Sequence, residues 1–432
     1  MFRNQSVSAH QFAMIPRADI PRAAFTLQKS LKTTFNAGDL VPCLCEEVLP
    51  GDTFRMNMVA FARLATPIFP VMDNLHFECF FFFVPNRLVW DNWQKFMGEQ
   101  VDPGDSIDFL IPTQTSPNNG YAIGSLQDYF GLPTVGSVVG GNTTTNSALP
   151  LRMYNLIYNE WFRDQNLIDS VVVDRDDGPD TVSDYVLLKR GKRHDYFTSC
   201  LPFLQKGDAV PLPLSGVAKV VTQSANHTTG VQAQGVRFFQ IDTGAAPIAN
   251  LAPTFAAAGA FSTGGAASTA GSGLYPTNLI ADLSAATSAT INELRLAFQI
   301  QRVLERDARG GTRYIEIILS HFGVRSPDAR LQRPEYLGGG STAININPVA
   351  QTSATTADGS DTPQGNLSAI GTGLLKSGFT QSFTEHGYVI GIVNVRADLT
   401  YQQGLRRHWF RSTRYDFYLP AFAMLGEQAV LN

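Results

Sequence analysis

Charged residues are scarce in this chain. Asp, Glu, Lys and Arg together make up 16% of its 432 residues, whereas about 25% is usual in a soluble domain. The hydrophobic fraction of 44% is ample for a core, and 11% of the residues are aromatic. This composition indicates that a partner covers much of the surface. The net charge of -4 argues against a chain that wraps nucleic acid by itself, since binding phosphates needs a basic surface.

Cysteine is also rare, and its four positions do not have the spacing of a metal site; they are Cys43, Cys45, Cys79 and Cys200. We expect structural thiols in a reducing compartment. The N-terminus lacks the apolar core of a signal peptide. No run approaches the ~18 apolar residues of a membrane span. The sequence therefore predicts a soluble protein that is not exported by these routes and has no membrane span.

The common catalytic motifs are missing: there is no P-loop, no nucleophile elbow and no zinc-protease motif. His194-Asp195 adjoins a basic run but lacks a third group, so a solvated or interface turn is the favoured interpretation. Gly310-Gly311, beside Arg309 and Arg313, is interpreted as a helix end and not as a phosphate cradle. We expect no enzyme activity, no cofactor and no metal site.

Two rival hypotheses remain: a β-sandwich carbohydrate-active enzyme and a carbohydrate-binding module. The enzyme would need two carboxylates about 5–10 Å apart in an aromatic cleft. No feature of the sequence identifies such a pair.

Lysine is absent between Lys219 and Lys376, and arginine takes its place. The chain has 25 Arg against 8 Lys, and residues 290–340 hold eight Arg and no Lys. A guanidinium pairs bidentately and is weakly hydrated, so it tolerates burial between surfaces. Arginine and aromatic enrichment with lysine depletion is typical of a contact surface. The predicted subunit-interface residues are Arg306, Arg309, Arg313, Arg330, Arg333 and Glu335. Their arginines are expected to form ion pairs, between subunits or within one, with acids such as Glu305, Asp328 and Glu335.

A second basic cluster, Arg406, Arg407, Trp409 and Arg411, combines guanidinium groups with an aromatic face. Arginine can contact phosphates, and aromatic rings can stack on unpaired bases. The cluster is therefore a candidate DNA contact. The alternative is a strand that alternates between the core and a subunit contact.

The pattern of the remaining chain predicts mostly strands. Residues 1–38 are expected to form an extended arm, because Pro16 and Pro21 keep its backbone out of helix. The Leu49–Asp52 segment has the Pro-Gly pair of a type II turn. Residues 77–84 are apolar on both faces, which predicts a strand covered on both sides. The expected strands are 31–35, 40–48, 53–64, 74–84, 379–398 and 409–418.

Three helices are expected, each with an apolar stripe that packs in the core. The first is 86–98 with Asn86 as its cap, the second is 151–166, and the third begins at a Thr290/Glu293 capping box. Residues 243–281, which carry no charge, and residues 338–373 lack a folding pattern of their own. Many strands with long excursions and few helices favour an antiparallel sandwich.

Seven segments carry a family resemblance. They are IPR (20–22), KTTFNAG (32–38), EVLPGDTF (47–54), DYFTS (195–199), RDARGGTRY (306–314), SPDARLQRPE (326–335) and LGEQ (425–428). In this order they resemble the major capsid protein of the Microviridae, and most closely that of the gokushoviruses among these single-stranded DNA phages. Family members usually run on past the last segment, whereas this sequence stops at Asn432; either a C-terminal part is missing or the branch is shorter.

The resemblance implies a mainly β protein with an eight-stranded antiparallel viral jelly roll, long inter-strand insertions and a few helices. It implies self-assembly into a T=1 icosahedral shell around a circular single-stranded DNA genome, with a small basic internal DNA-binding protein as a partner. It places the protein in the virion, assembled in the host cytoplasm. The insertion, about residues 212–285, would rise at the threefold axes toward a host surface receptor, for which a glycan is one candidate. Its apolar Phe255, Phe261 and Leu274 would face the host or pack against other copies.

We predict that replacing Arg313 by Lys lowers particle yield more than monomer solubility. Lysine keeps the charge but loses the planar, bidentate geometry that fixes the register of two surfaces. Particle yield by sedimentation, compared with the soluble fraction, tests this; equal losses, or none, would count against an interface role for Arg313.

Overall fold

The computed structural model describes residues 23–65, 71–195, 290–324, 331–349, 368–399 and 405–422, with shorter segments between 198 and 211 and six short strands between 219 and 282. The chain divides into two compact units. The first contains Met1–Arg193 and Arg330–Thr400, and the second contains His194–Ala329 and Tyr401–Asn432. The two units are described separately below.

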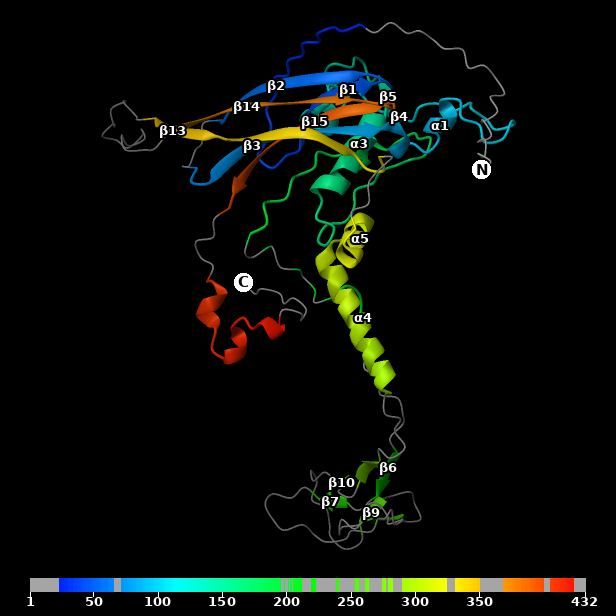
Figure 1. Ribbon diagram of the computed structural model, residues 1–432, viewed down its shortest axis with the longest axis vertical. Coiled ribbons are helices and arrows are strands. Elements are labelled where there is room, and N and C mark those ends of the chain that lie inside the picture. The colour runs from blue at the N-terminus through cyan, green and yellow to red at the C-terminus, as the bar shows by residue number, and fades with distance from the viewer. Residues whose placement is uncertain are drawn as a thin grey trace, which may run out of the picture. The chain divides into compact units, whose positions relative to one another are not determined.

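Two large antiparallel sheets form the body of the first unit (Figure 1), and a short pair, β4 (Thr113–Thr115) with β5 (Thr145–Ser147), accompanies them. The larger sheet has the order β1-β15-β3-β12, and the smaller has the order β13-β14-β2. Their bounds are β1 (Val41–Val48), β15 (Gly387–Asp398), β3 (Asn74–Pro85), β12 (Glu335–Ala343), β13 (Asn345–Val349), β14 (Ser368–Ser382) and β2 (Thr53–Arg63). This mainly antiparallel β architecture with few helices confirms the predicted fold class. The count of eight strands stays a prediction, because the described parts of these two sheets contain seven.

Strand β3 is buried on both faces, as its sequence predicts. Phe77, Phe81 and Phe83 point into a core shared with the smaller sheet, where they meet Leu375 and Phe379 of β14. The alternate side chains point the other way, because successive strand residues face opposite sides of a sheet. Each fully buried aromatic or aliphatic side chain contributes roughly 1.5–3 kcal/mol. The larger sheet is therefore the middle layer of the unit.

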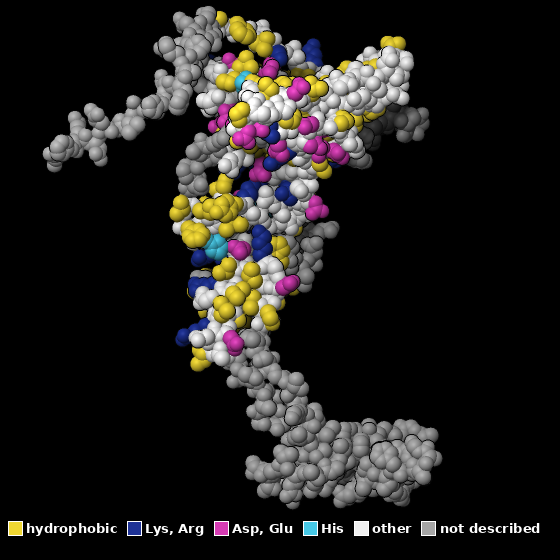
Figure 2. All heavy atoms as spheres, turned by 90° about the vertical axis from the view of Figure 1, so that its right-hand side faces the viewer, with side chains coloured by type: hydrophobic (Ala, Val, Ile, Leu, Met, Phe, Trp, Pro, Cys, Tyr) yellow, Lys and Arg dark blue, Asp and Glu magenta, His cyan; other side chains and the backbone are white. Residues whose placement is uncertain are grey.

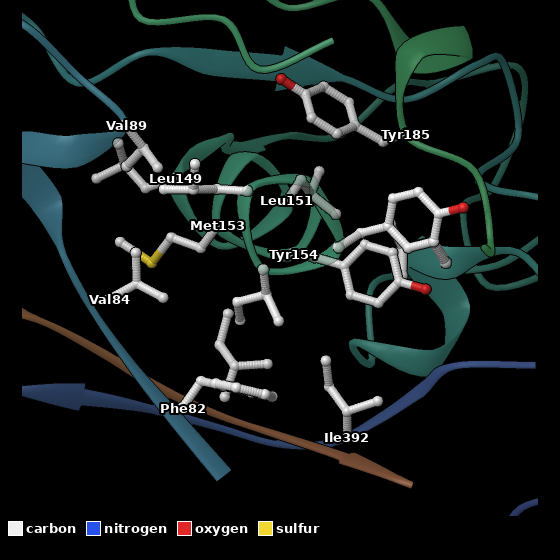
Figure 3. Close-up of a cluster of buried hydrophobic side chains, with 14 of the residues drawn as sticks. Phe82, Val84, Val89, Leu149, Leu151, Met153, Tyr154, Tyr185 and Ile392 are labelled. Carbon is white, nitrogen blue, oxygen red and sulfur yellow. The ribbon is translucent and has the colours of Figure 1, made fainter. Parts of the chain in front are cut away.

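The third layer is helix α3 (Leu149–Ile157) with a following π-helical turn (Tyr158–Phe162). Figure 3 shows Phe82 and Val84 of β3 and Ile392 of β15 facing Met153 and Tyr154 of this helix. The helix begins slightly before the predicted position, with Pro150 in its first turn, where a missing N–H costs nothing. The expected helix at 151–166 is confirmed in position.

The buried side chain of Arg152 links helix α3 to the loop segments that pack around it. The Arg152 side chain is fully buried, and its Nε donates to Asp180 Oδ2 at 2.8 Å. Its Nη1 donates to the carbonyl oxygens of Val89 at 3.0 Å and Asp176 at 2.9 Å. Tyr185 also donates to the Asp180 carboxylate. All of these partners lie in the long excursion between β3 and the arginine-rich turn near residue 190.

Several local expectations are correct. Asp52 N donates to Leu49 O at 3.0 Å, and Gly51 has φ 91°, as a type II turn requires. The cysteines Cys43, Cys45 and Cys79 are free, and burial raises the pKa of Cys43 and Cys45 to about 12. These two thiols are therefore protonated at neutral pH, which suits a structural role.

Other expectations are wrong. Residues 31–35 form no strand. The helix expected at 86–98 is broken into η1 (Asn86–Leu88) and α1 (Trp93–Phe96), and the Asn86 side chain does not cap it. Asn86 is buried instead, with its backbone N–H donating to His386 O at 3.1 Å. The turn that anchors β3 to the start of β15 thus overrides the helical pattern.

The glycine-rich run at 338–349 is not a loop, because it forms the greater part of β12 and all of β13. Gly339 lies so close to the backbone of β3 that a Cβ would clash with Cys79 O, and a Cβ on Gly340 would lie 3.1 Å from Ser377 Cβ. Small residues here permit close approach of neighbouring strands. The sequence pattern hid these strands because glycine carries no hydrophobic signal.

The second unit contains a helical hairpin. Helix α4 (Ile291–Gly310) begins at the predicted capping box: Thr290 Oγ1 accepts from Glu293 N at 3.2 Å, and Glu293 Oε2 accepts from Thr290 N at 2.8 Å. Gly311, at φ 95°, ends it, and α5 (Tyr314–Phe322) packs back on its C-terminal half. The predicted helix start and stop are both confirmed.

The rest of the second unit consists of short elements. Three two-stranded pairs lie in the chain before α4, and 3-10 helices follow residue 405. The pairs are β6 (Lys219–Thr222) with β11 (Leu279–Asp282), β7 (Phe238–Gln240) with β10 (Leu274–Pro276), and β8 (Pro253–Phe255) with β9 (Phe261–Thr263). The 3-10 helices are η4 (Arg407–Phe410), η5 (Arg414–Asp416) and η6 (Pro420–Phe422).

The strand expected at 409–418 is wrong. Asp416 accepts hydrogen bonds from the backbone N–H groups of Ser412 at 3.0 Å and Thr413 at 2.7 Å. These bonds lower the pKa of the Asp416 carboxyl to about 2. They also close a tight turn, so the local side-chain bonds override the alternating pattern.

We predict that replacing Arg152 by Ala lowers the free energy of unfolding by about 3–5 kcal/mol, because Asp180 would remain buried without its counter-charge. Urea denaturation followed by tryptophan fluorescence measures the effect. The matched control is Arg175→Ala at an exposed arginine, which should change stability by no more than about 0.5 kcal/mol. Similar losses in both variants would contradict this role for Arg152.

Candidate functional site

Helix α4 exposes its apolar residues, and the expectation that they pack in the core is wrong within the single chain. Ile291 is 71% exposed and Phe298 is 62% exposed. The shorter α5 covers only the C-terminal half of α4, where His321 Nε2 lies 2.5 Å from Asp307 Oδ1. The N-terminal half of α4 therefore has no cover from α5.

The exposed apolar residues of α4 form two stripes. One consists of Ile291, Leu294 and Phe298, and the other of Leu296, Ile300 and Val303. At 3.6 residues per turn these stripes lie on roughly opposite sides of the helix. In Figure 2 hydrophobic side chains gather over α4 and α5, with basic side chains among them, which in these two helices are all arginines. We refer to the exposed part of α4, residues 291–306, as the α4 surface.

The carboxylates of the hairpin all have local partners. Glu293 caps α4 at Thr290. Glu305 Oε2 lies 3.9 Å from Arg309 Nη2, and Asp307 pairs with His321. Glu316 Oε1 lies 3.2 Å from Arg313 Nη1. Acidic groups of the hairpin are thus used within it.

Three arginines are left over. Arg295, Arg302 and Arg306 are exposed and have no ion-pair partner among the residues that the structure describes. They lie on one face of α4, because Arg302 and Arg306 follow Arg295 by seven and eleven residues, which is about two and three helical turns. The α4 surface therefore combines bare guanidinium groups with two apolar stripes.

The predicted interface residues are divided between the units. Arg306, Arg309 and Arg313 belong to the α4–α5 hairpin. Arg333 and Glu335 belong to the first unit, at the start of β12, where the guanidinium of Arg333 lies 5.3 Å from the centre of the Trp161 ring. Arg330 and its expected partner Asp328 lie outside the described residues.

In the first unit the sequence pattern missed a cluster of three arginines around Glu78. This glutamate on β3 is 5% exposed. It accepts from Arg190, from Arg193 Nη2 at 3.1 Å and from Arg396 Nη2 at 3.3 Å. Two arginines of the basic run near residue 190 are thus held by a buried acid. The one signal was a single acidic residue inside the otherwise apolar run 77–84.

The Glu78 carboxylate remains ionised well below neutral pH. Burial alone would raise its pKa, but Arg190, Arg193 and Arg396 outweigh this effect and hold the pKa below its ordinary value of 4.5. Burial has the matching effect on Arg190, lowering the pKa of its guanidinium in spite of Glu78. The three guanidinium groups outnumber the Glu78 carboxylate, so the cluster keeps an excess of positive charge.

Beside this cluster lies an aromatic recess, lined by Phe80, Phe82, Trp161, Phe162, Arg190 and Tyr336. The guanidinium of Arg190 lies 4.6 Å from the centre of the Phe80 ring and 5.5 Å from that of Phe162. Trp161 Nε1 donates to Pro334 O at 3.0 Å, which fixes the indole at the edge of the recess. Stacked arginine and aromatic groups stabilise β12 against the end of α3.

The candidate DNA-contact residues form a short helical segment. Arg406 and Trp409 are exposed, with Trp409 at 71%, and Arg407 begins η4. The Arg411 guanidinium lies 5.1 Å from the centre of the Phe417 ring. The structure thus brings basic and aromatic groups together here, outside any strand, so the alternative of a strand in the core is wrong.

The three predicted insertion residues lie in the paired short strands of the second unit. Phe255 of β8 pairs with Phe261 of β9, and Leu274 of β10 pairs with Gln240 of β7. Their side chains lie outside the described residues. The role expected for them stays a prediction.

Within the described parts of the chain, no three His, Cys, Asp or Glu side chains converge as a metal site. No described helix is both long and apolar enough to cross a membrane.

The chain was compared with known proteins. A family described as "Capsid protein (F protein)" matches residues 13–432. The chain belongs to this capsid family. It is 50% identical over 427 residues to the capsid protein VP1 of Bdellovibrio phage phiMH2K, which covers 98% of the chain and 78% of that protein. The resemblance to the capsid proteins of the Microviridae is confirmed.

Two further relatives agree. The capsid protein VP1 of Chlamydia phage 1 is 40% identical over 99% of the chain and 80% of its own length. That of Spiroplasma virus 4 is 38% identical over 98% of the chain and 78% of its own length. Since these relatives are capsid proteins, the expectation of a structural protein and not an enzyme is confirmed, and the hypothesis of a carbohydrate-active enzyme is set aside.

We predict that replacing Glu78 by Gln in this capsid protein lowers the free energy of unfolding at pH 7 by about 2 kcal/mol, because three guanidinium groups lose their common anion. Since the folded pKa of Glu78 lies below 4.5, its contribution is fully present above pH 4.5 and disappears as the pH falls through the folded pKa. The stability difference between the two proteins should therefore shrink in acid. A difference that is constant from pH 7 to pH 3 would contradict the argument.

Proposed function

We propose that this capsid protein assembles with identical copies into a closed T=1 icosahedral shell around a circular single-stranded DNA genome, as in the gokushovirus branch. The α4 surface carries this proposal. It exposes six large apolar side chains and three arginines that have no ion-pair partner among the described residues, in a chain of a capsid family. A permanent contact between subunits buries about 2,000 Å² or more and is largely apolar. Arginine suits such contacts because its guanidinium tolerates partial desolvation.

The remaining proposed roles follow from charge and exposure. Arg406, Arg407, Trp409 and Arg411 are proposed to contact the genome by phosphate pairing and base stacking. Because the chain has a net charge of -4, a small basic internal protein is proposed to neutralise the remaining phosphates. The protein would then be a component of the virion, assembled in the host cytoplasm.

The segment at about residues 212–285 is proposed to form a threefold protrusion that attaches to a host surface receptor. Its central part, residues 243–281, carries no charge and has large apolar residues. Copies that pack together about an axis would cover such residues. A glycan is one receptor class for this segment, which leaves carbohydrate binding as a role of the insertion within the capsid function.

We predict that replacing Phe298 by Asp abolishes closed shells while the first unit stays folded. The substitution puts a charge on an apolar stripe that has to lose water on assembly, whereas it removes nothing from the core of the first unit. Negative-stain microscopy and velocity sedimentation report shells, and tryptophan fluorescence reports the fold, since all four tryptophans lie outside α4.

Phe298→Leu is the matched control, because it keeps an apolar side chain at the same place. Shells should form from this variant at a yield close to that of the unchanged chain. Normal shells from Phe298→Asp would show that the α4 surface is not a subunit contact.

A further inference from the structure

The α4 surface has a counterpart of opposite charge in the first unit. Between Lys95 and Arg152 the chain contains no Lys, Arg or His, although it has five acidic residues. Four of these lie in one loop, which we call the acidic loop (residues 99–111): Glu99, Asp102, Asp105 and Asp108. Residues 176–188 also hold four acidic residues and no base, but two of them, Asp176 and Asp180, already pair with the buried Arg152.

The acidic loop is shaped by its own hydrogen bonds. The Asp105 carboxylate accepts from the backbone N–H groups of Val101 at 3.2 Å and Asp102 at 3.1 Å. Gln100 Nε2 donates to Asp105 O at 2.7 Å. Asp105 is therefore used within the loop, and the other three carboxylates are presented outward.

Those three carboxylates have no basic partner among the described residues. Glu99, Asp102 and Asp108 are all exposed. The nearest base along the chain, Lys95, lies over the Phe109 ring at 5.9 Å from its centre. The loop also exposes apolar side chains: Val101 and Leu110 are each 83% exposed.

The acidic loop and the α4 surface are complementary in kind. Each mixes large exposed apolar side chains with three exposed charges that have no partner in the described chain, and the charges are of opposite sign. Opposite charges on facing surfaces fix the register of a contact and suppress wrong pairings, while the apolar groups supply burial. Such a match is unexpected for two surfaces that both face water.

We propose that the α4 surface of one copy docks on the acidic loop of a second copy, with Arg295, Arg302 and Arg306 facing Glu99, Asp102 and Asp108. This inference rests on the proposed assembly and names the two surfaces that meet in it. The contact is heterologous, since different surfaces of the two copies meet. A contact of this kind repeats around a ring or shell when its rotation closes.

Charge reversal in the full chain tests the pairing. Arg302→Glu with Arg306→Glu, and Asp102→Arg with Asp108→Arg, should each lower the yield of shells about tenfold or more, because like charges would face each other. Combining all four substitutions should restore most of the yield. The matched control is Arg55→Glu with Arg175→Glu, which reverses the charge of two exposed arginines of the first unit. Adding Asp102→Arg and Asp108→Arg to this control should not raise its yield of shells.

Cross-linking decides whether the contact joins two copies. Chains with Arg302→Cys and one tag are mixed with chains that carry Asp108→Cys and another tag, and a short bismaleimide is added. A covalent dimer that carries both tags is expected. A third chain carries both Arg302→Cys and Asp108→Cys. A cross-link within this chain, without any mixed-tag dimer from the single-substitution chains, would overturn the proposal, because the two surfaces would then meet within one copy.

The outcomes distinguish a failure of the proposed pairing from a failure of the proposed assembly. Shells from the unchanged chain, without rescue by the fourfold variant and without a mixed-tag dimer, would refute the pairing alone. Failure of the unchanged chain to form any oligomer would refute the proposed assembly itself.

Discussion

The apolar side chains on both faces of β3 are the constraint on which the first unit depends. A strand with Phe81 on one side and Phe82 on the other, both almost fully buried, cannot lie at a surface, so the larger sheet needs two covers. The smaller sheet provides one and α3 provides the other. Burial on both faces in turn isolates Glu78, and a buried anion is stable only with cations around it. The arginines near residue 190 and on β15 meet this need.

The α4–α5 hairpin differs from the first unit, because it pairs its acidic groups locally but leaves large apolar residues exposed. Its acidic groups are paired locally, its ends are capped, and its C-terminal half is covered by α5. Its apolar stripes and three of its arginines are nevertheless exposed. In a monomer such residues would only invite aggregation. In a capsid family the same residues are suited to contacts with other copies, because exposed apolar area is what subunit contacts bury.

Much of the fold could be predicted because strong local patterns agree with the final packing. The alternation in β2, the Pro-Gly turn before it and the capping box of α4 each specify their structure over a few residues. The failures have physical causes. Glycines in β12 carry no hydrophobic signal although they form a close strand contact, and at 409–418 the Asp416 carboxylate closes a turn against an alternating pattern. The helical period at 86–98 yielded to the connection between β3 and β15.

Of the candidate site, the arginine-rich composition and the position of α4 could be recognised in the sequence alone, because residue counts and capping signals are local. The sequence also determined the capsid family, through seven ordered segments, and the two-sided burial of β3. Only the tertiary structure decided which arginines are already neutralised. It brings Glu78 together with residues more than a hundred positions away, and within the described part of the chain it gives Arg295, Arg302 and Arg306 no ion-pair partner. Ion pairing depends on distances between side chains in space, and no one-dimensional pattern contains them.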